Sequence, residues 1–236
     1  MPNPQSQLSA ASLPQSYWPT DDEHDVSEAT GVDVVPFDPV MATVFGQTIA
    51  ADHRAVYALR DQYIAAPTVE EKQELLNLLM WNIARHVTTE EILVHPMCEK
   101  FLGSDMGGKL AEFDSNEHAA VKKSLLQLLE LGASPGSTEF DGAVEKVLGD
   151  LHRHNDSEEA SDVPTLEKNM TSAQAQELSQ AIEATKAFFV PSRFDRGSGD
   201  IITARALHAA LTVNSDSIGK DLFDFLGISP ASLPLN

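Results

Sequence analysis

The 236-residue sequence is poor in cysteine, in basic residues and in long apolar runs. Its one cysteine, Cys98, cannot form a disulfide within the chain. Lys and Arg number 16 against 36 Asp and Glu, a formal net charge of −20, which repels nucleic acid and anionic membrane surfaces. No uncharged run is long enough to cross a bilayer, and no apolar signal segment follows Met1. We therefore expect a cytoplasmic protein, with neither nucleic acid nor membrane as a partner, and a charge that suits a cationic ligand or metal.

Composition divides the chain into three parts. Residues 1–37 are rich in Pro, Ser and Gln, lack sustained apolar periodicity and are expected to form an irregular N-terminal arm. Residues 38–168 carry apolar residues at helical spacing, interrupted by short corners. Residues 169–236 begin with the capping pattern Thr171-Ser-Ala-Gln174, which predicts a C-terminal helical extension with one further helix up to about Pro191. The segment from Asp195 to Asp200 is expected to be a turn.

Four helices are expected within residues 38–168. Asp38-Pro39 resembles an N-cap followed by a proline in the first turn, Thr68 opens a capping box with Glu71, and Ser137 caps the last helix. The expected helices cover residues 38–66, about 70–95, about 110–131 and 138–164, with Pro96 ending the second and Gly103, Gly107 and Gly108 in the corner before the third. Helices of this length with short corners predict an all-α, up-down-up-down four-helix bundle.

The last two of these helices repeat the first two. Asp52-His53 is echoed by Glu117-His118, and each pair lies shortly before a valine. The second halves match as well: His86-x-x-x-Glu90-Glu91 and His154-x-x-x-Glu158-Glu159 are each followed by a proline ten residues past the histidine. A single His-x-x-x-Glu is weak evidence, but a doubled one with shared flanks indicates a repeated function.

The repeat predicts a metal centre inside the bundle. Residues four apart lie on one helix face about 6 Å apart, so His86 with Glu90, and His154 with Glu158, each form a chelating half-site. The expected helix ends place His53, His86, His118 and His154 at one level. Buried imidazoles and carboxylates need compensation, which metal supplies, and six ligands are more than one tetrahedral zinc ion can use. Two bridged ions, ligated by nitrogen and oxygen without thiolate, fit better, and iron, manganese and zinc all accept such donors.

These motifs resemble the hemerythrin-like, HHE-type cation-binding domain over roughly residues 40–168, in particular the forms with a C-terminal extension. The resemblance implies that the four histidines are terminal ligands and that Glu90 and Glu158 bridge two iron ions, forming a non-haem di-iron centre. It implies a centre that binds or reacts with oxygen, peroxide or nitric oxide, with an external electron donor if the reaction turns over. The alternative is an iron-binding, iron-buffering or metal-stabilised interaction module without turnover, so whether the protein is an enzyme stays open at this stage.

The sequence departs from the hemerythrins that carry oxygen reversibly, which bring two histidines four apart on the third helix. Four residues after His118 stands Lys122, and four before it stands Asp114. Asp114 or water would then take the place of the missing histidine, and an open position favours chemistry over storage. Glu91 and Glu159 lie one position off the inward face, where a carboxylate is solvated, holds a ligand in place or, less often, ligates metal itself. The remaining histidines, His24, His95, His152 and His208, are not expected to be ligands.

Overall fold

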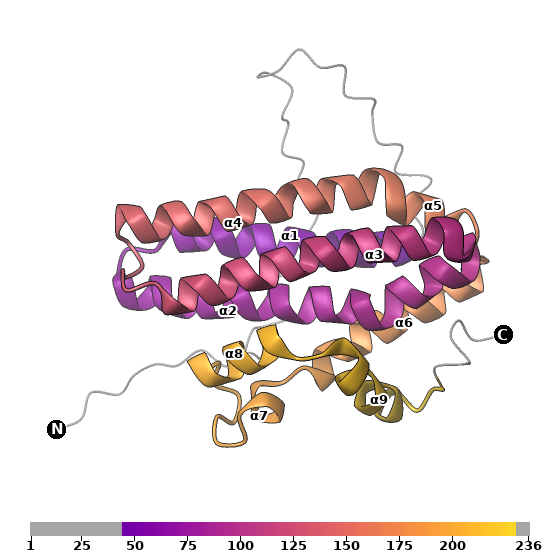
Figure 1. Ribbon diagram of the computed structural model, residues 1–236. Helices are drawn as coiled ribbons and strands as arrows, with labels where there is room; N and C mark the ends of the chain where they lie inside the picture. Colours follow the sequence, from indigo (N-terminus) through magenta and orange to yellow (C-terminus); the bar gives the residue numbers. More distant parts are fainter. Residues whose placement is uncertain (1–43, 230–236) are drawn as a thin grey trace, which may run out of the picture.

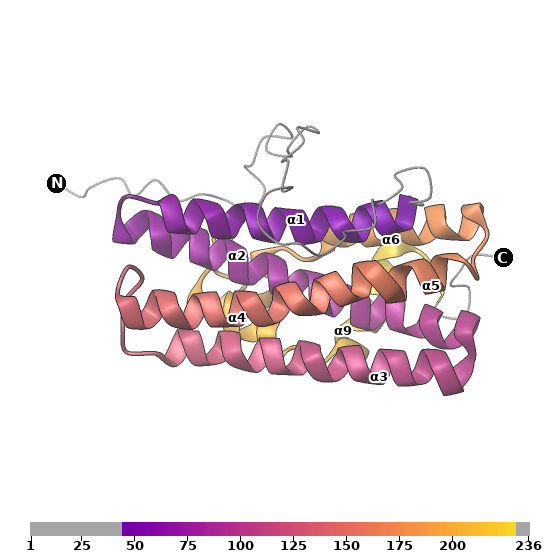
Figure 2. The same ribbon diagram turned by 90° about the horizontal axis from the view of Figure 1, so that it is seen from above.

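Every regular element that the computed structural model describes, over residues 44–229, is a helix. The predicted arm (residues 1–37) and the predicted start of the first helix at Asp38 fall outside these residues. The long helices are α1 (Val44–Ala65), α2 (Val69–Thr89), α3 (His95–Glu130) and α4 (Thr138–Ser157). They lie side by side, each running opposite to the one before it (Figures 1 and 2). The predicted all-α, up-down-up-down bundle is confirmed.

The bundle core is formed by the apolar faces that the sequence predicts. Ile49 of α1, Leu79 of α2, Leu125 of α3 and Leu151 of α4 are each 1% exposed, so every helix contributes a fully buried stripe. Thr68 and Ser137 cap α2 and α4 as predicted, since their side chains accept from the backbone N–H groups three residues on. The buried face of each of the four helices also carries polar residues, which form a cluster in the same interior.

Two π-helical turns extend α2 and α4. The first, η2 (Glu90–Val94), joins α2 to α3, and the second, η3 (Glu158–Asp162), joins α4 to α5 (Val163–Glu167). In each, a backbone N–H reaches back five residues, from His95 to Glu90 and from Val163 to Glu158. A proline follows both turns in the first turn of the next helix, where its missing N–H costs little. The prediction that Pro96 ends the helical segment was therefore wrong, because the wider turn absorbs the proline and the helix continues.

The corner expected before the third helix is a kink within α3, at Gly103. Its backbone has φ 78° and ψ 162°, a conformation that only glycine adopts readily, and the helix changes direction there. The expected start near Leu110 was too late, because residues 104–109 are already helical. Gly107 lies inside the helix, where a Cβ atom would stand 1.9 Å from the backbone oxygen of Cys98. Gly108 has only one atom near its would-be Cβ, the Cβ of Ser104 at 3.9 Å.

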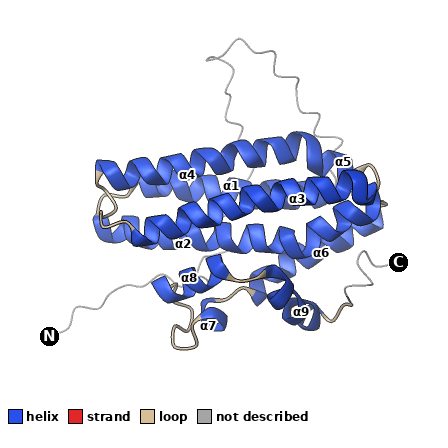
Figure 3. Ribbon diagram, in the orientation of Figure 1, coloured by secondary structure: helices blue, strands red, loops and turns tan. Residues whose placement is uncertain are grey.

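The C-terminal extension holds more helices than the one predicted. Its first helix, α6 (Ser172–Phe188), opens with the predicted capping box between Thr171 and Gln174. It is followed by α7 (Pro191–Phe194), α8 (Ala204–Thr212) and α9 (Ser215–Leu226), with the predicted turn between α7 and α8. These last three helices lie beneath α2 as drawn in Figure 1, and Figure 3 shows the described residues as helices and connecting loops. No described helix is long and apolar enough to cross a membrane.

We expect Gly107→Ala to lower the free energy of unfolding by about 3 kcal/mol, because a methyl group there overlaps backbone that cannot move aside. Gly108→Ala is the matched control: it lies one residue away in the same helix and should be neutral or stabilising by up to about 1 kcal/mol. Urea unfolding monitored by circular dichroism measures both. Equal effects of the two substitutions would contradict the close approach at Gly107.

Candidate metal centre

The six predicted site residues all lie inside the bundle. His53 comes from α1, His86 from α2, His118 from α3 and His154 from α4, while Glu90 and Glu158 are the first residues of the two π-helical turns. All six are at most 5% exposed. The structure therefore brings together one imidazole from each long helix and one carboxylate from each half of the repeat.

The imidazoles meet in two pairs. His53 Nε2 lies 3.0 Å from His86 Nε2, and His118 Nε2 lies 3.1 Å from His154 Nε2. The rings of each pair are nearly perpendicular, at 84° and 80°. Each pair belongs to one half of the repeat, so the halves present equivalent nitrogen pairs toward the interior.

The carboxylate of Glu90 lies between the two histidine pairs. Its Oε1 is 3.3 Å from His86 Nε2, and its Oε2 is 3.4 Å from His118 Nε2. Glu158 lies against the first pair, with Oε2 3.4 Å from His53 Nε2. Ligand atoms of His53, His86, Glu90 and Glu158 all fall within 4.8 Å of one another, close enough to hold one ion. Both oxygens of Glu90 and one of Glu158 are buried without a hydrogen-bond partner.

Each histidine also has a carboxylate facing its other ring nitrogen, Nδ1. Glu159 lies 2.5 Å from Nδ1 of His53 and Glu117 lies 2.6 Å from that of His154, while Asp52 faces that of His86 at 3.8 Å and Glu91 that of His118 at 3.6 Å. A carboxylate at Nδ1 retains the proton there, orients the ring and leaves Nε2 free to bind. Of these partners, the sequence pointed to Glu91 and Glu159 as neighbours of the ligands, but it assigned no role to Asp52 or Glu117.

The repeat places these carboxylates by a simple rule. Asp52 and Glu117 each precede a site histidine and face the other histidine of their own half. Glu91 and Glu159 each follow a site glutamate and face a histidine of the opposite half. The two halves are therefore linked through their ring nitrogens as well as through Glu90.

Burial dominates the electrostatics of the cluster. Burial, and then the negative charges of Glu158 and Asp114, raise the pKa of Glu90 well above its ordinary value. Burial lowers the pKa of His86 to about 4. Burial opposes charge on His53 too, but the carboxylates of Glu158 and Glu159 that face the ring outweigh it and raise the pKa of His53 to about 9. Carboxylates held this close in an apolar interior repel each other unless cations lie between them.

Lys122 and Asp114, the residues that stand four positions after and before His118, are placed differently. Lys122 points at Glu91, with Nζ 2.7 and 2.8 Å from its two carboxylate oxygens. Asp114, by contrast, is 7% exposed and its Oδ1 is buried without a hydrogen-bond partner. Burial and the charges of Glu158 and Asp162 raise the pKa of Asp114 to about 7. Asp114 is thus the carboxylate of α3 that lies in the interior one turn from His118.

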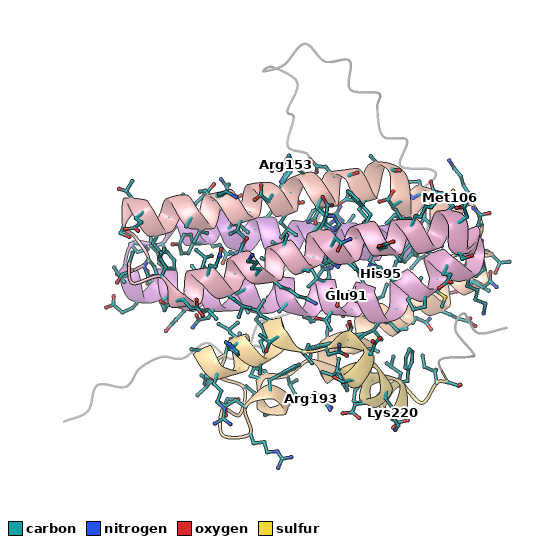
Figure 4. The ribbon with its side chains drawn as sticks, in the orientation of Figure 1. Glu91, His95, Met106, Arg153, Arg193 and Lys220 are labelled. Carbon is teal, nitrogen blue, oxygen red and sulfur yellow. The ribbon has the colours of Figure 1, made fainter. Side chains whose placement is uncertain are left out.

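His95 packs against His118 but is not one of the four histidines that meet in pairs. Its ring stacks on that of His118, with centroids 5.6 Å apart, and its Nδ1 lies 3.2 Å from the Ser115 hydroxyl. Figure 4 labels His95 beside Glu91 on the segment that joins α2 to α3. Burial lowers the pKa of His95 to about 4, so the ring packs as a neutral side chain.

Comparison with known proteins points to one family. Residues 45–166 match the model of the hemerythrin HHE cation-binding domain. An uncharacterized hemerythrin-like protein of Schizosaccharomyces pombe is 32% identical over 146 residues, which is 62% of this chain and 70% of that protein. No solved structure matches the chain significantly.

We expect Asp114→Asn to flatten the pH dependence of stability in the metal-free protein. The folded state keeps a proton on Asp114 up to about pH 7, whereas the unfolded chain loses it near the ordinary pKa of 3.8. The folded state therefore binds more protons in this range, and stability falls as the pH rises from about 4 to about 7. Denaturant unfolding across this range measures the slope. Asp105→Asn, at an exposed position of the same helix, is the control, and an unchanged slope in Asp114→Asn would contradict the assignment.

Proposed function

The chain belongs to the family of hemerythrin HHE cation-binding domains, and on that premise we propose that it is a cytoplasmic, non-haem di-iron protein that binds or reacts with oxygen, peroxide or nitric oxide. One iron is held by His53 and His86 and the other by His118 and His154. Glu90 and Glu158 bridge the two ions. The observation that carries this proposal is the position of the Glu90 carboxylate, with one oxygen toward each histidine pair.

The spacing of the imidazoles supports metal binding by each pair. The two Nε2 pairs lie 3.0 and 3.1 Å apart, close enough for both nitrogens of a pair to bind one ion. Iron and manganese both accept such nitrogen and oxygen donors.

The unpartnered carboxylate oxygens support the same proposal. A buried, unpaired carboxylate is costly, and both oxygens of Glu90 and Oε2 of Glu158 have no hydrogen-bond partner. Two divalent cations between the carboxylates would compensate these charges and those of the surrounding Asp52, Asp114 and Glu91.

The chain's own residues would orient and tune the site. Glu159 and Glu117, hydrogen-bonded to Nδ1 of His53 and His154, would hold these rings with Nε2 toward the interior and make the imidazoles better donors. Asp114, a buried carboxylate one turn from His118, would be placed to supply a further ligand or a proton there. A pair of iron ions supplies redox chemistry with oxygen, peroxide or nitric oxide, and turnover would take electrons from an external donor.

A second candidate is an iron-binding or iron-buffering module whose metal stabilises an interaction surface. The observation that favours it is the contact between the C-terminal extension and the site: Lys186 of α6 lies 3.2 Å from Asp52, the carboxylate that faces His86. Metal binding would then stabilise the packing of the extension without any reaction.

An anaerobic iron(II) titration followed by addition of oxygen, peroxide or nitric oxide separates the two. We expect about two irons per chain by elemental analysis and a change in the ligand-to-iron charge-transfer absorption on addition of at least one of these molecules. Two irons with unchanging absorption would favour the module. One ion per chain, or zinc retained after reconstitution with iron, would contradict the di-iron proposal.

We expect Glu90→Ala to leave at most one tightly bound iron per chain, because the oxygen atoms that face both histidine pairs are lost. Glu158→Ala should also lower iron content, and both variants should lose the increase in melting temperature that iron gives the native protein. Glu91→Ala and Glu159→Ala should keep both irons but lower their affinity about 10- to 100-fold, as loss of a carboxylate partner of a ligating histidine does. If Glu91→Ala and Glu159→Ala instead cause the larger loss of iron, the bridging carboxylates are Glu91 and Glu159.

A further inference from the structure

The internal repeat creates two equivalent grooves. Position by position, α3 repeats α1 with an offset of 65 residues, the spacing from His53 to His118, and α4 repeats α2 with an offset of 68, the spacing from His86 to His154. The groove between α1 and α2 therefore corresponds to the groove between α3 and α4. The first leads to His86 and the second to His154.

Helix α6 covers the groove between α1 and α2. The Thr48 hydroxyl lies 2.7 Å from that of Ser179, Thr89 donates to Thr185 over 3.1 Å, and Asp52 pairs with Lys186. Figure 2 shows α6 alongside α1, away from α3. Beneath it, the Asp52 side chain is only 3% exposed and Arg85 turns inward to it, at 3.3 Å. The route to His86 through this groove is closed.

The groove between α3 and α4 holds a pocket of about 310 Å³ instead. All of its lining residues belong to these two helices, and they include Phe113, Glu117 and Ser157, the equivalents of the three α1 and α2 residues that α6 contacts. His154 lines the pocket, beside the Glu117 carboxylate that binds its Nδ1. The Glu117 side chain is 39% exposed, against 3% for Asp52, its equivalent.

The equivalent arginines of the two grooves also differ in burial, as the carboxylates do. Arg85 is buried against Asp52, whereas its equivalent Arg153 pairs with Asp150 and with the carbonyl of Gly149, 3.0 Å away, on its own helix. Figure 4 shows Arg153 on the outer surface of α4. Arg85 therefore helps to close the first groove from within, whereas Arg153 leaves the second groove open.

We propose that the pocket between α3 and α4 is the entrance by which a small molecule reaches the metal centre, and that the molecule binds on the His118–His154 side. This inference rests on the proposed di-iron function, which supplies the centre to be reached. His154 is the one site histidine that lines this pocket, and it is only 5% exposed, so the route suits a small molecule such as oxygen, peroxide, nitric oxide or azide.

Two neighbouring alanines of α3 provide a matched test. Ala119 and Ala120 are both exposed, but only Ala120 lines the pocket. In the iron-loaded protein we expect Ala120→Trp to slow azide binding, followed by stopped-flow absorbance, about tenfold, because entrance then requires local opening of α3 against α4. Ala119→Trp should bind azide at the native rate. Ser157→Trp blocks the same pocket from α4 and should repeat the effect of Ala120→Trp.

A second measurement needs no iron. Diethyl pyrocarbonate modifies accessible imidazoles, and peptide mass spectrometry identifies the modified histidine. In metal-free protein we expect His154 to react about tenfold faster than His86, which α6 covers, and Ala120→Trp but not Ala119→Trp to remove this difference.

The outcomes separate the two proposals. A chain that binds no iron but shows the expected modification pattern would contradict the proposed function and leave the open groove supported. A chain that binds two irons but gives equal azide rates in Ala119→Trp, Ala120→Trp and Ser157→Trp would overturn the entrance alone. Equal modification of His86 and His154 would overturn it as well.

Discussion

The burial of Glu90 and Glu158 among four imidazoles is the constraint on which the rest of the structure depends. Moving a charged carboxylate into the interior costs several kcal/mol unless partners compensate it, and these two side chains are 2% and 5% exposed. Imidazoles of α1, α2 and α3 face these carboxylates, His154 of α4 pairs with His118, and a further carboxylate lies on the Nδ1 side of each ring. Sliding or rotating one helix would break contacts to at least two others. The polar cluster thus sets the relative register of helices whose apolar stripes alone would tolerate alternatives.

The π-helical turns let each half of the repeat contribute two consecutive carboxylates. On a regular helix, neighbouring side chains diverge by about 100°, so Glu90 and Glu91 would not approach the same ring. In the structure Glu90 faces Nε2 of His118 and Glu91 faces Nδ1 of that ring. Both turns begin at the site glutamate and end before a proline. The proline, which reads in the sequence as a helix stop, instead belongs to a local widening at the candidate site.

How much could be predicted from the sequence depends on the range of the interactions involved. Helical spacing and the internal repeat were enough for the bundle and for the clustering of the six site residues, because both follow from faces of single helices. The roles of Asp52 and Glu117 were not predictable, since each acts on a histidine of another helix and depends on how the two helices are rotated. Helices α8 and α9 were missed because they are short, at 9 and 12 residues, so each offers only about two to three turns in which a helical period can be recognised.

The asymmetry of the centre arises where the C-terminal extension meets the repeat. The duplicated helices supply equivalent imidazole pairs, arginines and grooves, but the residues that line the grooves are not identical. The difference arises where α6 meets a polar side chain of α1 that has a different counterpart in the second half, since Thr48 is replaced by Phe113. A phenylalanine in place of Thr48 removes the hydroxyl that contacts Ser179. The sequence differences between the halves therefore decide which groove the extension covers, and through it which histidine pair faces the pocket.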